Sequence, residues 1–308
     1  MTAERNTQDM QPGIPQEIEG TPRNRFNEML EARQDQGFNI CFGIDPDLER
    51  YKKSFQLPEM DITNPDGQLA NFLYDRAMEY VGATAEYAAV YKPNSGFFEQ
   101  YGAAGMQALD RIVASIHETH PEVPVIGDLK RGDIGNTQEA YARAAFEVTN
   151  FDAATVNPYM SGDAVLPFAK YKDQGTFVLV RTSNPDAAKT QDVKMEDGRP
   201  YWQHIAELTV KEWNGNNNIG IVVGATNPAE LSEVREIVGP DMQILAPGIG
   251  TQGGEIEKVV KAIGNNRFVA NVSRSHLYPD FQEGETYVDA VKRVSQKLHE
   301  QIQQAKAA

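Results

Sequence analysis

Eight short apolar runs recur along the 308 residues of this chain, and a segment with helical periodicity fills each gap between them. Runs that are apolar throughout, without alternating polar residues, are typical of parallel strands that helices cover. Eight such units in a chain of this length predict a (β/α)8 TIM barrel. The predicted strands are 38–44, 87–92, 123–128, 153–156, 176–180, 219–223, 243–246 and 267–271.

A doubly wound α/β sheet is the alternative fold, and it would use fewer strands. Its first strand would also lead into a glycine-rich nucleotide-binding turn, a fingerprint that Gly43-Ile44-Asp45-Pro46-Asp47 lacks. Residues 1–22 are polar and have no apolar core of the kind found in signal peptides. We therefore expect a mobile N-terminal tail, 1–22, followed by a single barrel domain at 23–308.

Composition narrows the classes of partner. The net charge of −15 disfavours nonspecific binding to nucleic acid or to an anionic membrane. No apolar window approaches the roughly 18 residues that suggest a membrane span. The single cysteine, Cys41, can form no disulfide within the chain, which fits a reducing compartment such as the cytoplasm.

Ionisable residues follow several of the predicted strands, where barrel enzymes place their chemistry. Asp128 and Lys130 end the third strand and project to the same face, because side chains alternate along a strand. Asp133 follows after a turn, while Asp45 and Lys92 end the first and second strands. Charged groups at strand ends cost burial energy unless they pair, so their recurrence predicts one shared polar site.

A glycine-rich stretch, Pro247 to Gly254, follows the seventh strand and contains four glycines in eight residues. Its backbone N–H groups can converge on an anion, and a helix pattern that starts near Gly254 adds the positive end of a dipole. A flexible turn is the alternative reading. With Arg274 after the neighbouring eighth strand, we favour a phosphate site.

Two further features are less specific. The long polar segment 182–199 after the fifth strand is either a lid that excludes water or a plain surface insertion. The five histidines form no HExxH motif or comparable ligand spacing, and no flavin, nicotinamide or serine-nucleophile signature is present. We therefore expect neither a metal nor a cofactor.

The third strand end identifies a family. The run Asp128-Leu129-Lys130-Arg131-Gly132-Asp133-Ile134, followed by Thr137, resembles the signature of orotidine 5'-phosphate decarboxylases. The segments Val90-Tyr91-Lys92-Pro93-Asn94 and Phe97-Phe98-Glu99 resemble the region around that enzyme's second-strand lysine. Arg131, together with Arg181-Thr182-Ser183-Asn184-Pro185, resembles the subgroup typified by mycobacterial enzymes, the type 2 enzymes. The resemblance spans about residues 25–300.

The resemblance implies decarboxylation of orotidine 5'-phosphate to uridine 5'-phosphate, the last step of de novo UMP synthesis, without cofactor or metal. Lys130 would give a proton to C6 and stabilise the carbanion, and Asp128 would face the departing carboxylate. Asp133 would reach the site from the partner subunit of a homodimer. Lys92 and Asp45 would hold ribose hydroxyls with help from Thr137, and Ser183 would touch the pyrimidine. The 5'-phosphate would be held by Gly250, Gln252, Gly253 and Arg274. Pro247 and Ser273 would be further substrate-binding positions.

Two other functions remain open from the sequence. A metal-dependent sugar-phosphate decarboxylase or aldolase would use the same barrel and phosphate loop, but with more carboxylates near the third strand and without Arg131-Gly132 and Ser183. A noncatalytic phosphate-binding barrel would not need alternating charges on adjacent strand ends.

Overall fold

The computed structural model describes residues 26–55, 68–249, 253–264 and 267–308. The predicted N-terminal tail, 1–22, lies outside these residues. None of the described helices is both long and apolar enough to cross a membrane.

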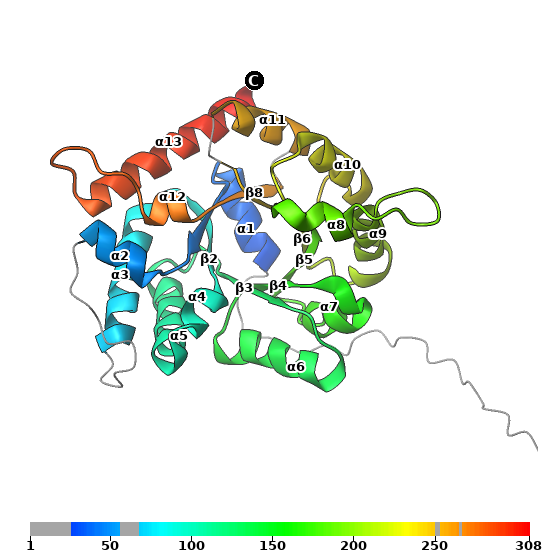
Figure 1. Ribbon diagram of the computed structural model, residues 1–308, viewed down its shortest axis with the longest axis horizontal. Coiled ribbons are helices and arrows are strands. Elements are labelled where there is room, and N and C mark those ends of the chain that lie inside the picture. The colour runs from blue at the N-terminus through cyan, green and yellow to red at the C-terminus, as the bar shows by residue number, and fades with distance from the viewer. Residues whose placement is uncertain (1–25, 56–67, 250–252, 265–266) are drawn as a thin grey trace, which may run out of the picture.

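Within the described residues, eight parallel strands form one sheet in the order β2-β1-β8-β7-β6-β5-β4-β3. Isolated parallel bridges from Tyr91 to Val125 and from Asn94 to Asp128 join β2 to β3. These bridges bring the two edges of the sheet together, so the predicted (β/α)8 barrel is confirmed (Figure 1). The strands are β1 Ile40–Ile44, β2 Ala88–Pro93, β3 Ile126–Arg131, β4 Ala153–Val156, β5 Gly175–Arg181, β6 Ile219–Val223, β7 Ile244–Pro247 and β8 Phe268–Val272.

Seven strands lie within two residues of their predicted bounds. The exception is β3, which we predicted at 123–128 and which runs from Ile126 to Arg131. Our prediction followed the apolar residues, but Pro124 lacks an N–H for the sheet. The strand continues through Asp128 and Lys130, whose side chains line a cavity at the strand ends, to Arg131, which pairs with Glu99.

Helices surround the barrel wall, and one of them, α1, lies over an end of the barrel instead (Figure 1). The longer ones are α1 Phe26–Asp35, α2 Leu48–Phe55, α3 Gln68–Thr84, α5 Gly102–Thr119, α6 Gly135–Arg143, α7 Gly162–Ala169, α9 Tyr201–Leu208, α10 Pro228–Val238, α11 Gly253–Ile263 and α13 Tyr287–Ala307. The short ones are α4 Ser95–Glu99, α8 Ala188–Gln191 and α12 Arg274–Leu277. The helix predicted at 136–149 is α6 followed by a π-helical turn, Ala144–Val148.

Two apolar clusters hold the barrel together. The larger one fills the space between the sheet and the outer helices. The smaller one takes at least one residue from every strand, among them Cys41, Ile126 and Phe177, so it fills the barrel interior. Phe26 and Leu30 of α1 join this interior cluster and close the N-terminal end of the barrel. The opposite end, where the strands finish, is left for polar side chains.

Candidate active site

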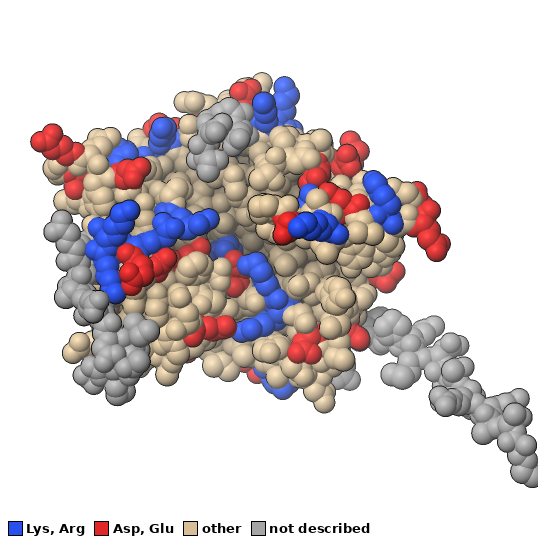
Figure 2. Space-filling model, in the orientation of Figure 1, with Lys and Arg blue, Asp and Glu red and all other residues tan. Residues whose placement is uncertain are grey.

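A cavity of about 760 Å³ opens at the C-terminal ends of the strands. Figure 2 shows the corresponding face hollowed near its centre, with basic and acidic side chains around the hollow. Every strand contributes to the lining, either itself or through the loop that follows it. The lining residues include Asp45, Lys92, Asp128, Lys130, Thr155, Asn157, Ser183, Gln191, Pro247, Gly248, Asn271, Ser273 and Arg274.

Lys92, Asp128 and Lys130 form a charged array in this cavity. Lys92 Nζ lies 2.7 Å from Asp128 Oδ2, and Lys130 Nζ contacts the other carboxylate oxygen, Oδ1. Lys92 and Asp128 are only 4% and 8% exposed, whereas the Lys130 side chain is about half exposed. The shared polar site predicted from the strand ends is therefore present, with Lys130 as its accessible cation.

Electrostatics keeps Asp128 and Lys92 ionised. Burial alone would raise the pKa of Asp128, but the ammonium groups of Lys92 and Lys130 hold that pKa well below its usual range. Burial alone would lower the pKa of Lys92, but the carboxylates of Asp128 and Asp45 raise it above its usual value. The carboxylate thus stays negative and Lys92 stays positive at neutral pH.

Asp45 also lines the cavity and follows β1, the strand that pairs with the Lys92 strand β2. The Ser273 hydroxyl donates a hydrogen bond to Asp45 Oδ2, which fixes the carboxylate. The other oxygen, Asp45 Oδ1, is buried and has no hydrogen-bond partner among the described residues. A buried carboxylate oxygen without a donor is costly, so Oδ1 is suited to accept a hydrogen bond from a bound ligand.

The predicted phosphate site is described only in part. Pro247, Ser273 and Arg274 line the cavity, and Arg274 is the exposed first residue of α12. Gly250 and Gln252 lie outside the described residues. Gly253 begins α11, an 11-residue helix whose positive N-terminal end follows this loop.

Ser183 reaches the cavity because the chain after β5 packs tightly against Gly224. A Cβ atom at position 224 would lie 2.9 Å from Ser183 Cα, so only glycine permits this approach. The following segment, predicted as a lid or an insertion, forms a 3-10 turn, Pro185–Ala187, and then α8. Gln191 at the end of α8 lines the cavity, and its Oε1 accepts a 2.9 Å hydrogen bond from the N–H of Thr182. This part of the segment therefore forms a wall of the cavity.

Two predicted site residues do not line the cavity of their own chain. Asp133 Oδ1 accepts a 2.8 Å hydrogen bond from the N–H of Ile134, and Gln138 Oε1 accepts one from the N–H of Asp133. Thr137 is exposed on the first turns of α6. Within the described chain, neither residue belongs to the lining around Lys130.

Sequence reasoning missed Thr155 and Asn271. Thr155 is buried on β4 and donates a 3.0 Å hydrogen bond to Asp128 Oδ1. Asn271 on β8 lines the cavity, and its Oδ1 accepts a 3.3 Å hydrogen bond from the thiol of Cys41. A signal was available for Thr155, because it is the one polar residue in the run Ala153-Ala154-Thr155-Val156.

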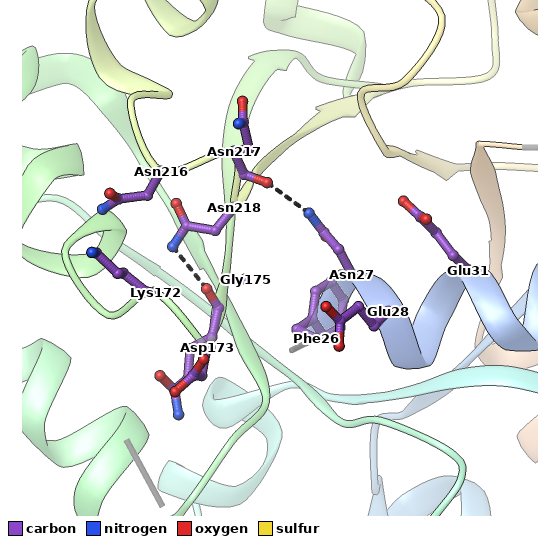
Figure 3. Close-up of a pocket in the computed structure, with 11 residues that line it drawn as sticks. Phe26, Asn27, Glu28, Glu31, Lys172, Asp173, Gly175, Asn216, Asn217 and Asn218 are labelled. Carbon is purple, nitrogen blue, oxygen red and sulfur yellow. Dashed lines mark hydrogen bonds between the residues drawn. The ribbon is translucent and has the colours of Figure 1, made fainter. Parts of the chain in front are cut away.

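A second hollow, of about 100 Å³, lies at the opposite end of the barrel, beside the start of α1 (Figure 3). Its amide side chains bind the main chain. Asn27 donates to the Asn217 carbonyl at 2.8 Å (Figure 3). Asn218 donates to the Gln174 carbonyl at 2.9 Å. These bonds hold α1 and two loops together, so we assign the amide side chains of this hollow a structural role.

This chain is similar in sequence and fold to orotidine 5'-phosphate decarboxylases. The sequence model of the orotidine 5'-phosphate decarboxylase / HUMPS family matches residues 39–275. The orotidine 5'-phosphate decarboxylase of Roseiflexus castenholzii is 39% identical over 285 residues, covering 92% of this chain and 98% of that protein. The one from Thermomicrobium roseum is 44% identical over 261 residues, covering 83% and 87%. The solved structure of Leishmania donovani OMP decarboxylase matches with a TM-score of 0.76 and 31% identity, covering 92% of this chain and 99% of that one. The chain therefore belongs to the orotidine 5'-phosphate decarboxylase / HUMPS family.

Proposed function

We propose that this chain decarboxylates orotidine 5'-phosphate to uridine 5'-phosphate, the last step of de novo UMP synthesis, with Lys130 as the proton donor. The observation that carries the proposal is the array of Lys92, Asp128 and Lys130 inside the cavity at the strand ends. Two relatives of this chain, with 39% and 44% sequence identity, are named orotidine 5'-phosphate decarboxylase.

The chemical step breaks the bond between C6 of the pyrimidine and its carboxylate. Carbon dioxide leaves, the electron pair stays on C6, and the Lys130 ammonium passes a proton to that carbon. Before the transfer, the ammonium charge stabilises the carbanion as it develops, which is electrostatic catalysis by a preorganised group. Lys130 suits this role because its side chain is anchored to Asp128 and still half exposed to the cavity.

Asp128 faces the substrate carboxylate in this arrangement. Two unit charges about 4 Å apart interact by about 4 kcal/mol at an effective dielectric constant of 20, so repulsion between the carboxylates favours loss of carbon dioxide. Stabilisation of the carbanion by Lys130 acts on the transition state directly and is the main contribution in this proposal.

Other cavity residues hold the rest of the nucleotide. Asp45 and Lys92 bind ribose hydroxyls, for which Asp45 Oδ1 offers a buried acceptor. Ser183 contacts the pyrimidine. Arg274 binds the 5'-phosphate together with the loop Pro247 to Gly253 and the start of α11. Local positive groups are needed because the whole chain carries a net charge of −15.

The active unit is a homodimer in which Asp133 and Thr137 enter the partner's cavity. This proposal is supported by their position outside the cavity of their own chain. Large apolar side chains, Ile134, Tyr159 and Met160, are exposed after β3 and β4, as expected of a surface that contacts another subunit. A cytoplasmic location is proposed from the lone free cysteine, Cys41.

An absorbance assay that follows loss of the orotate chromophore tests the function directly. Purified protein treated with EDTA is mixed with orotidine 5'-phosphate, and conversion to uridine 5'-phosphate is expected at the untreated rate. Loss of turnover on chelation, restored by Mg²⁺, favours the sugar-phosphate alternative. Binding of the nucleotide without any turnover favours the noncatalytic barrel.

A further inference from the structure

We infer that Thr155 is a positioning residue for the decarboxylation, because its hydroxyl holds the backbone bulge that aims Lys130 and also orients the Asp128 carboxylate. The inference rests on the proposed function, since it assigns Thr155 a task in the same site. Thr155 lies on β4, is 1% exposed, and is one strand away from the two residues on which it acts.

The pairing of β3 with β4 is irregular at the catalytic residues. Gly127 pairs with Ala154, and the next pair is Arg131 with Val156. Between these pairs, three residues of β3, Asp128 to Lys130, face the single residue Thr155. Such a bulge leaves extra backbone groups without partners in the sheet. Buried N–H groups need an acceptor, so something other than the β4 main chain has to bind them.

The Thr155 hydroxyl supplies that acceptor. Its Oγ1 accepts hydrogen bonds from the N–H of Leu129 at 3.0 Å and from the N–H of Lys130 at 2.9 Å. It donates its own hydrogen to Asp128 Oδ1 at 3.0 Å. A hydroxyl has two acceptor positions and one donor, so all three are used here. The hydroxyl thus binds the backbone of the bulge and the carboxylate that anchors Lys130.

The backbone of Lys130 shows why the bulge needs support. Its φ angle is +48°, in the left-handed region that side chains other than glycine rarely adopt. This conformation turns Lys130 onto the cavity side, where its ammonium contacts Asp128. Because side chains alternate along a strand, a change of register by one residue points them to the other face. Losing the Thr155 hydroxyl is therefore expected to displace the proton donor.

Thr155→Val tests the role of the hydroxyl, since it keeps the branched shape and replaces only the polar group. We expect kcat to fall by about 10²-fold, the loss that a misplaced catalytic group typically causes. KM for orotidine 5'-phosphate and the Kd for uridine 5'-phosphate are expected to change little, because Thr155 binds no part of the nucleotide in this proposal. Thr155→Ser keeps the hydroxyl and is expected to restore most of kcat.

Thr176→Val is the matched control on the adjacent strand β5. Thr176 is fully buried and pairs with Ala154 in the sheet. Its hydroxyl has no hydrogen-bond partner in the part of the chain that the structure describes. The same loss of a hydroxyl at this position is expected to leave kcat unchanged.

If circular dichroism shows that Thr155→Val does not fold, Thr155→Cys takes its place, because a thiol forms only weak hydrogen bonds.

The outcomes separate this inference from the proposed function. Wild-type protein that does not convert orotidine 5'-phosphate contradicts the function itself. If the wild type is active, a folded Thr155→Val or Thr155→Cys variant with wild-type kcat overturns the role of Thr155 alone. Equal impairment of Thr155→Val and Thr155→Ser, or a loss confined to KM, also overturns it, since either result points to packing or substrate binding.

Discussion

Lys92 Nζ lies 2.7 Å from Asp128 Oδ2, and both side chains are almost wholly buried. The second ammonium on this carboxylate, that of Lys130, is by contrast half exposed. The Asp128 carboxylate therefore pairs with two different lysines. Lys92 is buried and stabilises the fold, whereas Lys130 is accessible and can contact substrate. Replacing each lysine is expected to have a different effect.

Lys130→Ala should abolish turnover and leave binding of uridine 5'-phosphate largely intact. Proton donation by a positioned side chain typically contributes about 10²–10⁴-fold, and loss of charge stabilisation adds to that. Steady-state kinetics measures the first effect, and calorimetric titration with the product nucleotide measures the second. Retention of more than roughly a tenth of wild-type kcat would contradict the assignment, because even the low end of that range predicts a larger loss.

Lys92→Ala should destabilise the fold itself. Breaking a buried ion pair typically costs about 3–5 kcal/mol. Lys130 still contacts the Asp128 carboxylate in this variant, so we expect the lower end of that range. The matched control is Lys189→Ala, because Lys189 pairs with Asp186 at the same 2.7 Å but both side chains are 74% exposed. That variant should change stability by less than about 1 kcal/mol. Denaturant unfolding measures the free energy of unfolding of both variants. Equal losses in the two variants would contradict the explanation that burial makes the Lys92 pair important for stability.

Arg274→Ala should weaken the use of substrates that carry the 5'-phosphate and barely affect orotidine, the nucleoside without phosphate. The reason is that Arg274 is an exposed cation in the cavity lining, to which Pro247 and Gly248 also belong. The ratio of kcat/KM for the two substrates is the measurement. Binding energy at a remote phosphate also assists the reacting carbon, so kcat is expected to fall as well. An equal loss for both substrates would show that Arg274 acts elsewhere.

Mixing two inactive variants tests the shared site. Lys130→Ala and Asp133→Ala homodimers should each be nearly inactive. In a mixed dimer, one site combines an intact Lys130 with the partner's intact Asp133, and the other site carries both defects. With statistical exchange about half of the dimers are mixed, so about a quarter of wild-type activity per subunit should return, as two-fold symmetry requires.

The control for this experiment is independent proof of subunit exchange, for example by mass spectrometry of tagged chains. If Asp133 served its own barrel, every subunit in the mixture would still carry one defect in its own site. No recovery of activity after verified exchange would then overturn the shared-site proposal.

Local sequence patterns determined the architecture and most of the site. Eight apolar runs identified the strands because burial on both faces of a barrel wall excludes polar alternation. Because a barrel gathers the C-terminal ends of its strands, Asp45, Lys92, Asp128 and Lys130 could be assigned to one cavity before any contact was known. The motif at the third strand also identified the family.

Tertiary structure alone decided how β3 ends. The strand continues to Arg131, and its bulge depends on the register of β4 and on a hydroxyl 25 residues further along the chain. Only in the folded barrel is it apparent that Thr155 binds the backbone of Lys130 or that Asp133 lies outside its own cavity. Strand identity follows from short-range periodicity, whereas register and side-chain direction depend on partners that are distant in sequence and meet only when the barrel closes.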